Sequence, residues 1–356
     1  MIKVIHIVGA RPQFVKLAPL YYQMKENQFM QEILHTGQHY DDNMSKNFFS
    51  TLNIPEPNYN LSINNLSHGS MTGRMIENIE KVLINKQFDY VVLYGDTNST
   101  LAGAIASKKL GFRIIHVEAG VRNHDKNMPE EINRALTDRI SDLLFCSSVI
   151  SYNNLKNEGY VNIDCKLANV GDLMFETFQK NFNSENTTVS NNILFTCHRE
   201  DNLRKENLSQ IVTAINKLSE NYKIIFPAHP STRNKLKKYK LKCNFKVLEP
   251  MPYPKLLGET GKSKFVITDS GGLIKEAYWL KKPSLSIMKN PVWPELIKAK
   301  VSFNSYPDSS NILSEFLRLG QVNSFPDNIF GNGSASESIV KIISEDYFEK
   351  IKEDVI

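Results

Sequence analysis

The feature that most constrains the fold is an alternation of short apolar runs with helical stretches. In the first half the apolar runs are 2–8, 90–94, 112–117 and 142–146, each followed by a glycine or a polar residue. Helical patterns follow two of them, at 15–24 and 100–109. Continuously apolar strands belong to parallel sheets with both faces covered by helices. The chain is therefore predicted to be an α/β protein whose ligands bind beyond the carboxyl ends of its strands.

The alternation is interrupted once, by a polar, asparagine-rich stretch at 179–192 that has the character of a linker. Apolar runs resume at 193–196, 222–226, 245–248, 265–268 and 283–287, and 336–347 has the pattern of a terminal amphipathic helix. A chain of 356 residues suggests about two domains at roughly 100–200 residues each. We therefore predict two doubly wound domains, 1–180 and 190–335, around a central cleft.

Composition excludes several classes of protein. The chain has 43 Lys and Arg against 38 Asp and Glu, without the clustered basic excess of a nucleic-acid binder. No run approaches the roughly 18 apolar residues of a membrane span, and the N-terminal run is too short for a signal peptide. The four cysteines form no pair, and the histidines lack ligand spacing. We expect a cytoplasmic protein without metal, nucleic-acid or membrane partners.

Three acidic residues are predicted to meet at one edge of the first sheet. Asp96 and Glu118 each follow an apolar run, and Glu130 comes shortly afterwards in Met128-Pro129-Glu130-Glu131. Carboxylates gathered there can move protons on and off carbon or oxygen. The alternative is structural, since Asp96 could cap the helix near Thr100 and Glu130 could lie in a first helical turn. Three acidic positions at the ends of neighbouring strands favour a catalytic role over this structural one.

The loop after the first strand is predicted to bind an anion. Gly9 is followed by Arg11 and Lys16 at the start of a helix, where free N–H groups and the helix dipole attract negative charge. Surface charges are the equally weighted alternative. With a single glycine the loop lacks the G-x-G-x-x-G pattern of dinucleotide sites, and the chain has no P-loop. Hydride transfer and phosphoryl transfer therefore lose support.

The second half carries further polar residues just after its strands. A histidine and an arginine can supply a proton carrier and a fixed cation, and a Ser-Gly-Gly helix start can cradle a phosphate. A carboxylate one to two turns into that helix suits the hydroxyls of a ribose. These residues are His198, Arg199, His229, Ser270, Gly271, Gly272 and Glu276. His39, in a polar and aromatic stretch, is interpreted as a substrate-side or lid loop; a structural turn fits equally well.

Together these segments resemble a known family. Gly9-Ala10-Arg11-Pro12-Gln13, Thr36-Gly37-Gln38-His39, Gly95-Asp96-Thr97, His116-Val117-Glu118-Ala119-Gly120, Pro129-Glu130-Glu131, His198-Arg199-Glu200 and Asp269-Ser270-Gly271-Gly272 occur in the order of bacterial, non-hydrolysing UDP-N-acetylglucosamine 2-epimerases. The resemblance runs from about Lys3 to Pro294. It implies a GT-B-like fold of two Rossmann-like domains, with the C-terminal helix 336–356 returning to the first, and a homodimer without a cofactor.

The same resemblance implies an activity and a role for each residue. The family interconverts UDP-GlcNAc and UDP-ManNAc through elimination of UDP and its re-addition to a 2-acetamidoglucal. Asp96, Glu118, Glu130 and His198 fall on catalytic positions, and Arg11 and Lys16 on phosphate or sugar contacts. Ser270, Gly271 and Gly272 match diphosphate contacts, and Glu276 matches the ribose carboxylate.

Two departures from the family pattern keep other functions open. The opening has Ala10 and Gln13 where Thr and Glu are usual, and 288–295 (MKNPVWPE) replaces an R-D-x-T-E-R-P-E segment. The opening and Trp293 are more similar to the branch that acts on UDP-2,3-diacetamido-2,3-dideoxyglucuronate, although that branch keeps the Arg-Asp pair. A hydrolysing 2-epimerase, a GT-B glycosyltransferase and a nucleotide-sugar sensor are the further alternatives. UDP-GlcNAc is slightly favoured as substrate.

Overall fold

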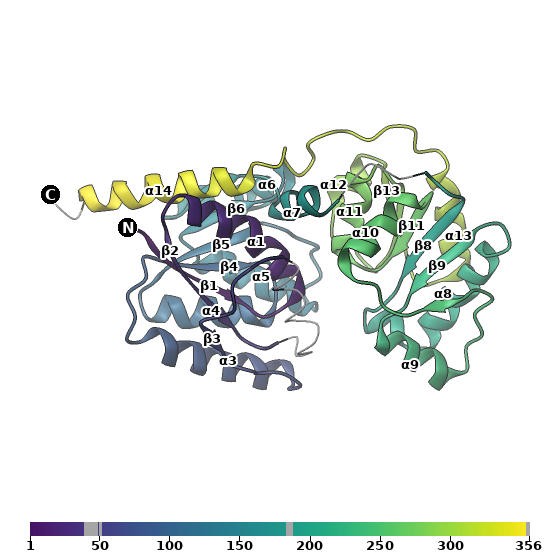
Figure 1. The fold of residues 1–356 in the computed structure, drawn as a ribbon, viewed down its shortest axis with the longest axis horizontal. Coiled ribbons are helices and arrows are strands. Elements are labelled where there is room, and N and C mark those ends of the chain that lie inside the picture. The colour runs from purple at the N-terminus through teal and green to yellow at the C-terminus, as the bar shows by residue number, and fades with distance from the viewer. Residues whose placement is uncertain (39–48, 50–51, 183–187, 354–356) are drawn as a thin grey trace. The chain divides into compact units, whose positions relative to one another are not determined.

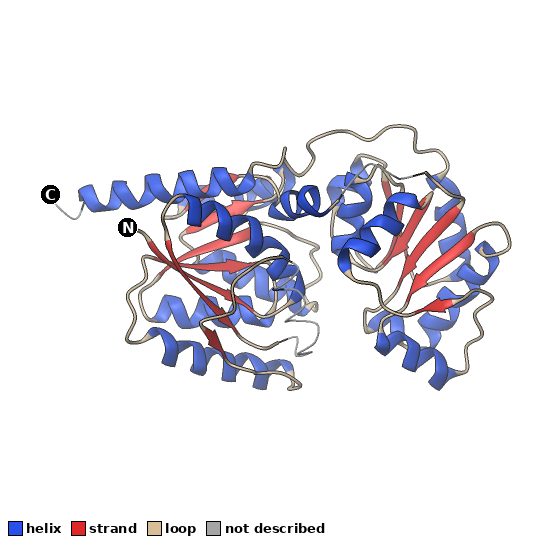
Figure 2. Cartoon of the chain, in the orientation of Figure 1, coloured by secondary structure: helices blue, strands red, loops and turns tan. Residues whose placement is uncertain are grey.

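Two parallel β-sheets, each with helices on both faces, form the framework of the chain (Figures 1 and 2). The computed structural model describes residues 1–38, 49, 52–182 and 188–353. The chain divides into unit 1, Met1–Thr177 with Phe330–Ile356, and unit 2, Phe178–Ile329. The sequence places the corresponding boundaries at 180–190 and at 335–336.

Unit 1 contains a seven-stranded sheet in the order β3-β2-β1-β4-β5-β6-β7. Its strands are β1 (Lys3–Val8), β2 (Met30–His35), β3 (Tyr59–Asn60), β4 (Tyr90–Tyr94), β5 (Arg113–Ala119), β6 (Leu143–Cys146) and β7 (Lys166–Asn169). Its helices are α1 (Arg11–Glu26), α3 (His68–Leu83), α4 (Asn98–Lys109), α5 (Pro129–Ile140), α6 (Val149–Asn157) and α14 (Ala335–Glu353), and α7 (Leu173–Asn181) crosses the boundary. Every residue of β4 is buried, as expected for a strand covered on both faces.

Unit 2 contains a six-stranded sheet in the order β10-β9-β8-β11-β12-β13. Its strands are β8 (Asn192–Thr196), β9 (Lys223–Pro227), β10 (Val247–Leu248), β11 (Phe265–Thr268), β12 (Ser284–Ile287) and β13 (Ser302–Ser305). Its helices are α8 (Lys205–Leu218), α9 (Pro230–Tyr239), α10 (Tyr253–Lys262), α11 (Gly271–Trp279), α12 (Pro294–Lys298) and α13 (Ser309–Leu319). The predicted α/β class with two parallel sheets is therefore confirmed.

Strand order fixes where each unit can bind a ligand. All strands are parallel, and the order in which successive strands are added to the sheet reverses between β1 and β4 in unit 1 and between β8 and β11 in unit 2. Helices leave opposite faces of the sheet at such a reversal, and this opens a crevice at the carboxyl ends of the two strands. The motif residues after β1, β4, β8 and β11 lie at these two points.

The C-terminal helix α14 belongs to unit 1 although it follows unit 2 in sequence (Figure 1). Its anchor is Asp346, which is 3% exposed. The carboxylate accepts a hydrogen bond from the hydroxyl of Tyr90 at 2.6 Å and forms ion pairs with Arg113 at 2.9 Å and Lys166 at 3.0 Å. Three donors from three strands thus hold one helix against the sheet.

Several element boundaries differ from those predicted. The first helix begins at Arg11 rather than at 15, since Pro12 fits a first helical turn and Gln13 caps the end. The terminal helix extends to Glu353, and the run at 245–248 forms only the two-residue strand β10. The predicted linker is shorter, because α7 continues to Asn181 and β8 begins at Asn192.

None of the helices among the described residues is long and apolar enough to span a membrane.

Candidate active site

The loop after β1 is tied to β4 by the side chain of Gln13. Its Oε1 accepts hydrogen bonds from the backbone N–H groups of Gly9 at 2.7 Å and Ala10 at 2.9 Å, and its Nε2 donates to the carbonyl of Tyr94 at 2.8 Å. A Cβ at Gly9 would lie 2.0 Å from Oγ1 of Thr36, so this position requires glycine. Two amides near the predicted anion site therefore already have an acceptor within the protein.

Lys16 and Glu118 form an ion pair at the carboxyl edge of the unit 1 sheet. Nζ of Lys16 lies 2.7 Å from Oε1 of Glu118, and the two side chains are 5% and 11% exposed. Lys16 is therefore not the surface charge that the structural alternative assumed. A Cβ at Gly95 would lie 3.4 Å from Oε1 of Glu118 and 3.5 Å from Nζ of Lys16. The loop after β4 thus runs directly beside the pair.

The backbone at Glu118 has an uncommon conformation. Its φ is +69°, and the pairing of β5 with β6 shifts register between Val117 and Ala119. A left-handed φ at a residue other than glycine costs about 1–3 kcal/mol and is concentrated at functional sites. The bulge ends the regular ladder and re-aims the Glu118 side chain at the sheet edge.

Asp96 is held by a second ion pair. Its carboxylate contacts the guanidinium of Arg134, which also pairs with Glu131 at 2.9 Å. The amide of Asn133 donates to the carbonyl of Asp96 at 2.9 Å. Asp96 does not cap α4, since the capping residue is Thr97. Its side chain remains 30% exposed and accessible to a ligand.

The two glutamates at the start of α5 differ in their surroundings. Glu131 is buried and accepts hydrogen bonds from the backbone N–H groups of Asn123 at 3.1 Å and His124 at 3.0 Å, besides its bond with Arg134. Glu130 lies in the first turn, as the structural alternative supposed, and is partly exposed. Glu131 is therefore a structural residue, and Glu130 is the glutamate that a ligand can reach.

Arg134, Asp138 and Arg122 are not among the site residues predicted from the sequence, although all three are buried near this site. A signal was present in α5. Arg134 and Asp138 follow Glu130 at intervals of four, which places all three on one helix face, whereas Ile132 and Leu136 lie elsewhere on the helix.

In unit 2 the carboxylate of Asp269 organises the edge of the sheet. It is fully buried and accepts hydrogen bonds from the backbone N–H groups of His198 at 2.9 Å and Arg199 at 2.9 Å, and from the side chain of Asn202 at 3.1 Å. Nδ1 of His198 lies 3.0 Å from Asp269 Oδ1. Burial by itself raises the pKa of Asp269, but His198 and the backbone donors outweigh it and lower the pKa to about 2.

The loops after β8 and β11 therefore meet at this carboxylate. His198 is 44% exposed, and the bond from its Nδ1 to Asp269 holds the ring at the sheet edge. Nε of Arg199 donates to the carbonyl of Asp269 at 2.8 Å. His229, after β9, has its ring 6.4 Å from that of His198 and caps α9 through Ser231.

The predicted phosphate loop forms the start of α11. Ser270 is the N-cap, and its hydroxyl accepts from the N–H of Leu273 at 3.4 Å. Gly271 and Gly272 begin the helix, and Glu276 is buried farther along it. This arrangement presents amide groups and a hydroxyl at a positive helix end, as the binding of a phosphate requires.

The divergent segment 288–295 contacts the same helix. Nε1 of Trp293 donates to the carbonyl of Gly271 at 2.8 Å, and Nζ of Lys275, which is fully buried, lies 3.4 Å from the centre of the indole ring. Trp293 thus packs on the start of α11 and forms a cation–π contact.

For two further predicted site residues, Arg11 and His39, the structure gives little information about the site. Arg11 is the first residue of α1 and is partly exposed. His39 lies outside the described residues. Among the described residues no group of three or more His, Cys, Asp or Glu side chains could hold a metal ion.

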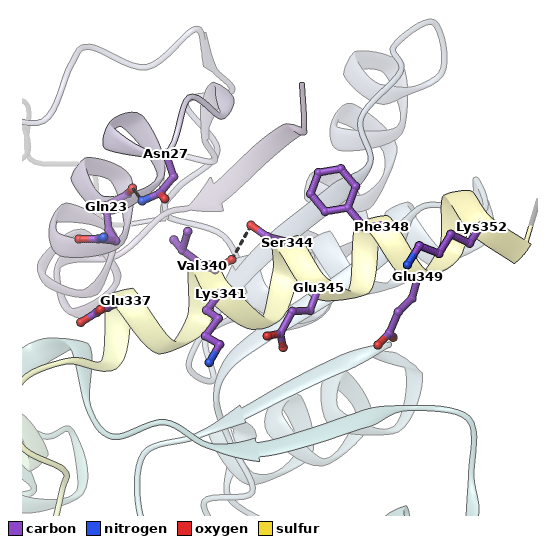
Figure 3. A pocket seen from close by; sticks show the side chains of 10 residues that line it. All are labelled: Gln23, Asn27, Glu337, Val340, Lys341, Ser344, Glu345, Phe348, Glu349 and Lys352. Carbon is purple, nitrogen blue, oxygen red and sulfur yellow. Dashed lines mark hydrogen bonds between the residues drawn. The ribbon is translucent and has the colours of Figure 1, made fainter.

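Unit 1 also has a groove of about 620 Å³ on its surface (Figure 3). It runs between α1 and α14 and is lined by Gln23, Asn27, Val340, Ser344 and Phe348, with charged residues of α14. Its lining contains none of the predicted site residues, so the crevices at the strand reversals remain the candidate site.

Known proteins are similar to this chain in both sequence and fold. The sequence model of the UDP-N-acetylglucosamine 2-epimerase family matches residues 23–344. A UDP-2,3-diacetamido-2,3-dideoxy-D-glucuronate 2-epimerase of Pseudomonas aeruginosa is 40% identical over 96% of this chain and 99% of its own. A UDP-N-acetylglucosamine 2-epimerase of Methanococcus maripaludis is 39% identical over 96% and 98%. The crystal structure of Methanocaldococcus jannaschii UDP-GlcNAc 2-epimerase with UDP-GlcNAc and UDP has a TM-score of 0.89 at 37% identity, covering 97% of this chain and 100% of that one.

Proposed function

The chain belongs to the UDP-N-acetylglucosamine 2-epimerase family, and on that premise we propose that it interconverts UDP-GlcNAc and UDP-ManNAc. It is an isomerase of UDP-sugars with a GT-B-like fold, as the resemblance of the sequence implies. The observation that carries the proposal is the pair of carboxylates at one sheet edge: Glu118 bound to Lys16, and Asp96 bound to Arg134.

The reaction needs proton transfer at a weakly acidic carbon. A carboxylate removes the proton from C2, and the C1–O bond breaks with its electron pair leaving on UDP, which gives a 2-acetamidoglucal. A proton is then returned to the other face of C2, and the phosphate oxygen of UDP adds back to C1. Both halves need an acid or base at C2 and stabilisation of the departing diphosphate.

We assign the proton transfers to Glu118, Asp96 and Glu130. Glu118 is paired with Lys16 and Asp96 with Arg134, and each cation holds its carboxylate in position. Glu118 lies near the end of β5 and Asp96 follows the neighbouring strand β4, so two carboxylates can serve two faces of a sugar. Glu130 is partly exposed in the first turn of α5, where the helix dipole favours its negative charge.

We assign recognition of UDP to the loops of unit 2. Arg199 supplies a cation and the His198 ring supplies a further hydrogen-bonding group for the diphosphate, and His198 is held for this by Asp269. Ser270, Gly271 and Gly272 supply a helix N-terminus, and Glu276 accepts from the ribose hydroxyls. Arg11 and His229 are assigned to further phosphate or sugar contacts, as is His39, which lies outside the described residues.

A second substrate has support of its own. The Pseudomonas aeruginosa relative, which is named for the diacetamido glucuronate, is 40% identical to this chain, and two archaeal relatives named for UDP-N-acetylglucosamine are 39% and 38% identical. The two sugars differ by a carboxylate and a second acetamido group. Lys289, in the divergent segment, is a candidate partner for that carboxylate.

The test is to incubate the protein with each UDP-sugar in heavy water and to follow the sugar by proton NMR. Loss of the H2 signal together with growth of UDP-ManNAc supports the proposal. Exchange only with the diacetamido glucuronate favours the second substrate. Accumulation of free sugar and UDP indicates the hydrolysing reaction. Binding of UDP-sugar without exchange on either substrate contradicts an epimerase and favours a glycosyltransferase or a sensor.

We further propose that the protein is a cytoplasmic homodimer, in keeping with the family resemblance. Light scattering on the purified protein should give twice the chain mass of 40.6 kDa. A mass of one chain at micromolar concentration contradicts the dimer.

A further inference from the structure

Unit 1 buries two histidines within one sheet, and their partners differ. His6 in β1 and His116 in β5 are both completely buried. Nδ1 of His6 lies 2.8 Å from the hydroxyl of Tyr94, and Nε2 lies 3.0 Å from Oε1 of Gln31. A neutral ring satisfies both, since Nε2–H donates to the amide oxygen and Nδ1 accepts from the hydroxyl. Burial accordingly lowers the pKa of His6 to about 4.

His116 has an acceptor on each side. Nδ1 lies 2.7 Å from Oδ1 of Asp138, and Nε2 lies 2.7 Å from the backbone carbonyl of Gly95. A carbonyl oxygen can only accept, and so can an ionised carboxylate. Both ring nitrogens must therefore donate, and a histidine with two N–H groups is an imidazolium.

The charges around Asp138 agree with a protonated His116. Its other oxygen accepts from the guanidinium of Arg122 at 2.7 Å. Arg122 is also bound through two of its nitrogens to Glu158, each at 2.8 Å. Arg122 and Glu158 thus balance one another, and the charge left on Asp138 is matched by His116. Burial raises the pKa of Asp138, but the bonds from His116 and Arg122 outweigh it and lower the pKa.

Two other titratable groups near Asp138, a cysteine and a tyrosine, add no charge to this balance. Cys146 in β6 and Tyr160 both have a raised pKa, chiefly through burial and with a contribution from the charge of Asp138, so both stay neutral. Arg139, on the neighbouring position of α5, points its guanidinium at the ring of Tyr160, 6.0 Å from its centre.

The His116–Asp138 pair contacts the backbone on both sides of the candidate carboxylates. His116 holds the carbonyl of Gly95, the residue before Asp96, while the N–H of Gly95 donates to the carbonyl of Val117, the residue before Glu118. Asp138 accepts from the N–H of Gly120, two residues after Glu118, at 3.2 Å. The hydrogen bonds of the His116–Asp138 pair thus hold the backbone on both sides of the strained bulge.

We propose that His116 is a permanent imidazolium that, together with Asp138, positions the Glu118 bulge and the Gly95-Asp96 turn for proton transfer at C2. His116 is a positioning residue: it acts through the backbone and touches no substrate. The catalytic part of this inference rests on the proposed function, whereas the protonation state of His116 does not. His6, equally buried but bonded to neutral groups, is the matched control.

The protonation state can be measured on the unaltered, substrate-free protein. Nitrogen-15 NMR with labelled histidine, assigned with single variants, should show both ring nitrogens of His116 protonated from pH 6 to pH 8.5. His6 should show one protonated nitrogen over the same range. A neutral His116 at pH 7 overturns the proposal, and this measurement does not depend on the folding of any variant or on activity.

The positioning role is tested with His116→Gln, Asp138→Asn and the control His6→Gln. Glutamine cannot donate to Gly95 and Asp138 together, so we expect kcat to fall about 100-fold while KM stays within about threefold, as for a misplaced catalytic group. His6→Gln should stay within about threefold of wild-type kcat. Variants are compared once their circular dichroism and UDP affinity match wild type.

Equal kcat in His116→Gln and His6→Gln overturns the positioning role, as does a rise in KM without a fall in kcat. A wild-type protein that exchanges no C2 proton on either UDP-sugar defeats the proposed function instead. The nitrogen NMR result then decides the imidazolium assignment alone.

Discussion

Glu118 combines three features that are each unfavourable in free energy. It has a left-handed φ, it sits at a register shift, and its carboxylate is nearly buried against Lys16. Each is unfavourable for a glutamate in a strand, and a site of proton transfer gives a reason for all three. The sequence placed Glu118 after a strand, but neither the bulge nor its cation could be predicted, since Lys16 is 102 residues away.

We expect Glu118→Gln to lower the rate of C2 exchange by about 10²–10⁴-fold, the usual contribution of a general base. The amide keeps the shape of the side chain but cannot take up a proton. Deuterium incorporation at C2, followed by NMR, measures the effect. UDP affinity by calorimetry should be unchanged, and exposed Glu77→Gln on α3 should exchange like wild type. Wild-type exchange in the Glu118 variant would remove it from the mechanism.

Asp269 gives a prediction on pH. Its pKa is lowered from 3.8 to about 2, so it stabilises the folded protein above pH 4 and this stabilisation is lost as pH falls from about 4 to about 2. Asp269→Asn should lower the free energy of unfolding by about 2 kcal/mol at pH 7. Urea unfolding at pH 7 and pH 3 measures it. A gap between variant and wild type that does not narrow at pH 3 contradicts the prediction.

At the scale of one element, α5 shows where pattern reasoning fails. Hydrophobic periodicity predicts that Ile132 and Leu136 face the core, yet they are 46% and 49% exposed. The buried face instead carries Arg134, Thr137 and Asp138. The helix turns its polar face to the sheet because Arg134 pairs there with Asp96, which follows β4, and Asp138 pairs with His116 of β5 and with Arg122 of the following loop. Local propensity cannot reveal such partners, which lie on other elements.

The end of β5 depends on one glycine. Gly120 has φ +78°, and an added Cβ would lie 2.2 Å from the carbonyl oxygen of Ser151 in α6. Gly120→Ala combines strain with a backbone clash, so we expect a loss of about 3 kcal/mol in the free energy of unfolding. The control is Gly111→Ala, where φ is +82° but nothing lies within 4 Å, with an expected loss of about 1 kcal/mol. Equal losses in urea unfolding would show that the clash is relieved by movement of α6.

At the scale of the whole molecule, the chain folds into two units, each with its own apolar core. One core joins β8, β9, α8 and α13 of unit 2, and another joins β1, β4, α3 and α4 of unit 1. The chain crosses from one unit to the other and then returns through Phe330 to α14. The amphipathic pattern predicted the helix at 336–347, but its place against unit 1 followed from the family resemblance and not from the pattern.

The return of α14 depends on Asp346. Asp346→Asn removes the charge that pairs with Arg113 and Lys166, so we expect a loss of about 3 kcal/mol and faster hydrogen exchange along α14. The control is Glu349→Gln on the same helix, whose 65% exposed carboxylate also contacts Lys166 and should change stability by less than about 1 kcal/mol. Unchanged exchange in α14 of the Asp346 variant would mean that apolar contacts alone hold the helix.

The sequence by itself determined the architecture, because buried parallel strands and covering helices leave local patterns that need no partner to be recognised. It also placed the candidate residues at strand ends, since a strand and the loop that follows it are neighbours in the chain. Only the tertiary structure decided which polar side chains meet: Lys16 with Glu118, Arg134 with Asp96, His116 with Asp138. Such pairs depend on strand order and register. These are set by contacts between distant segments, which a linear pattern does not record.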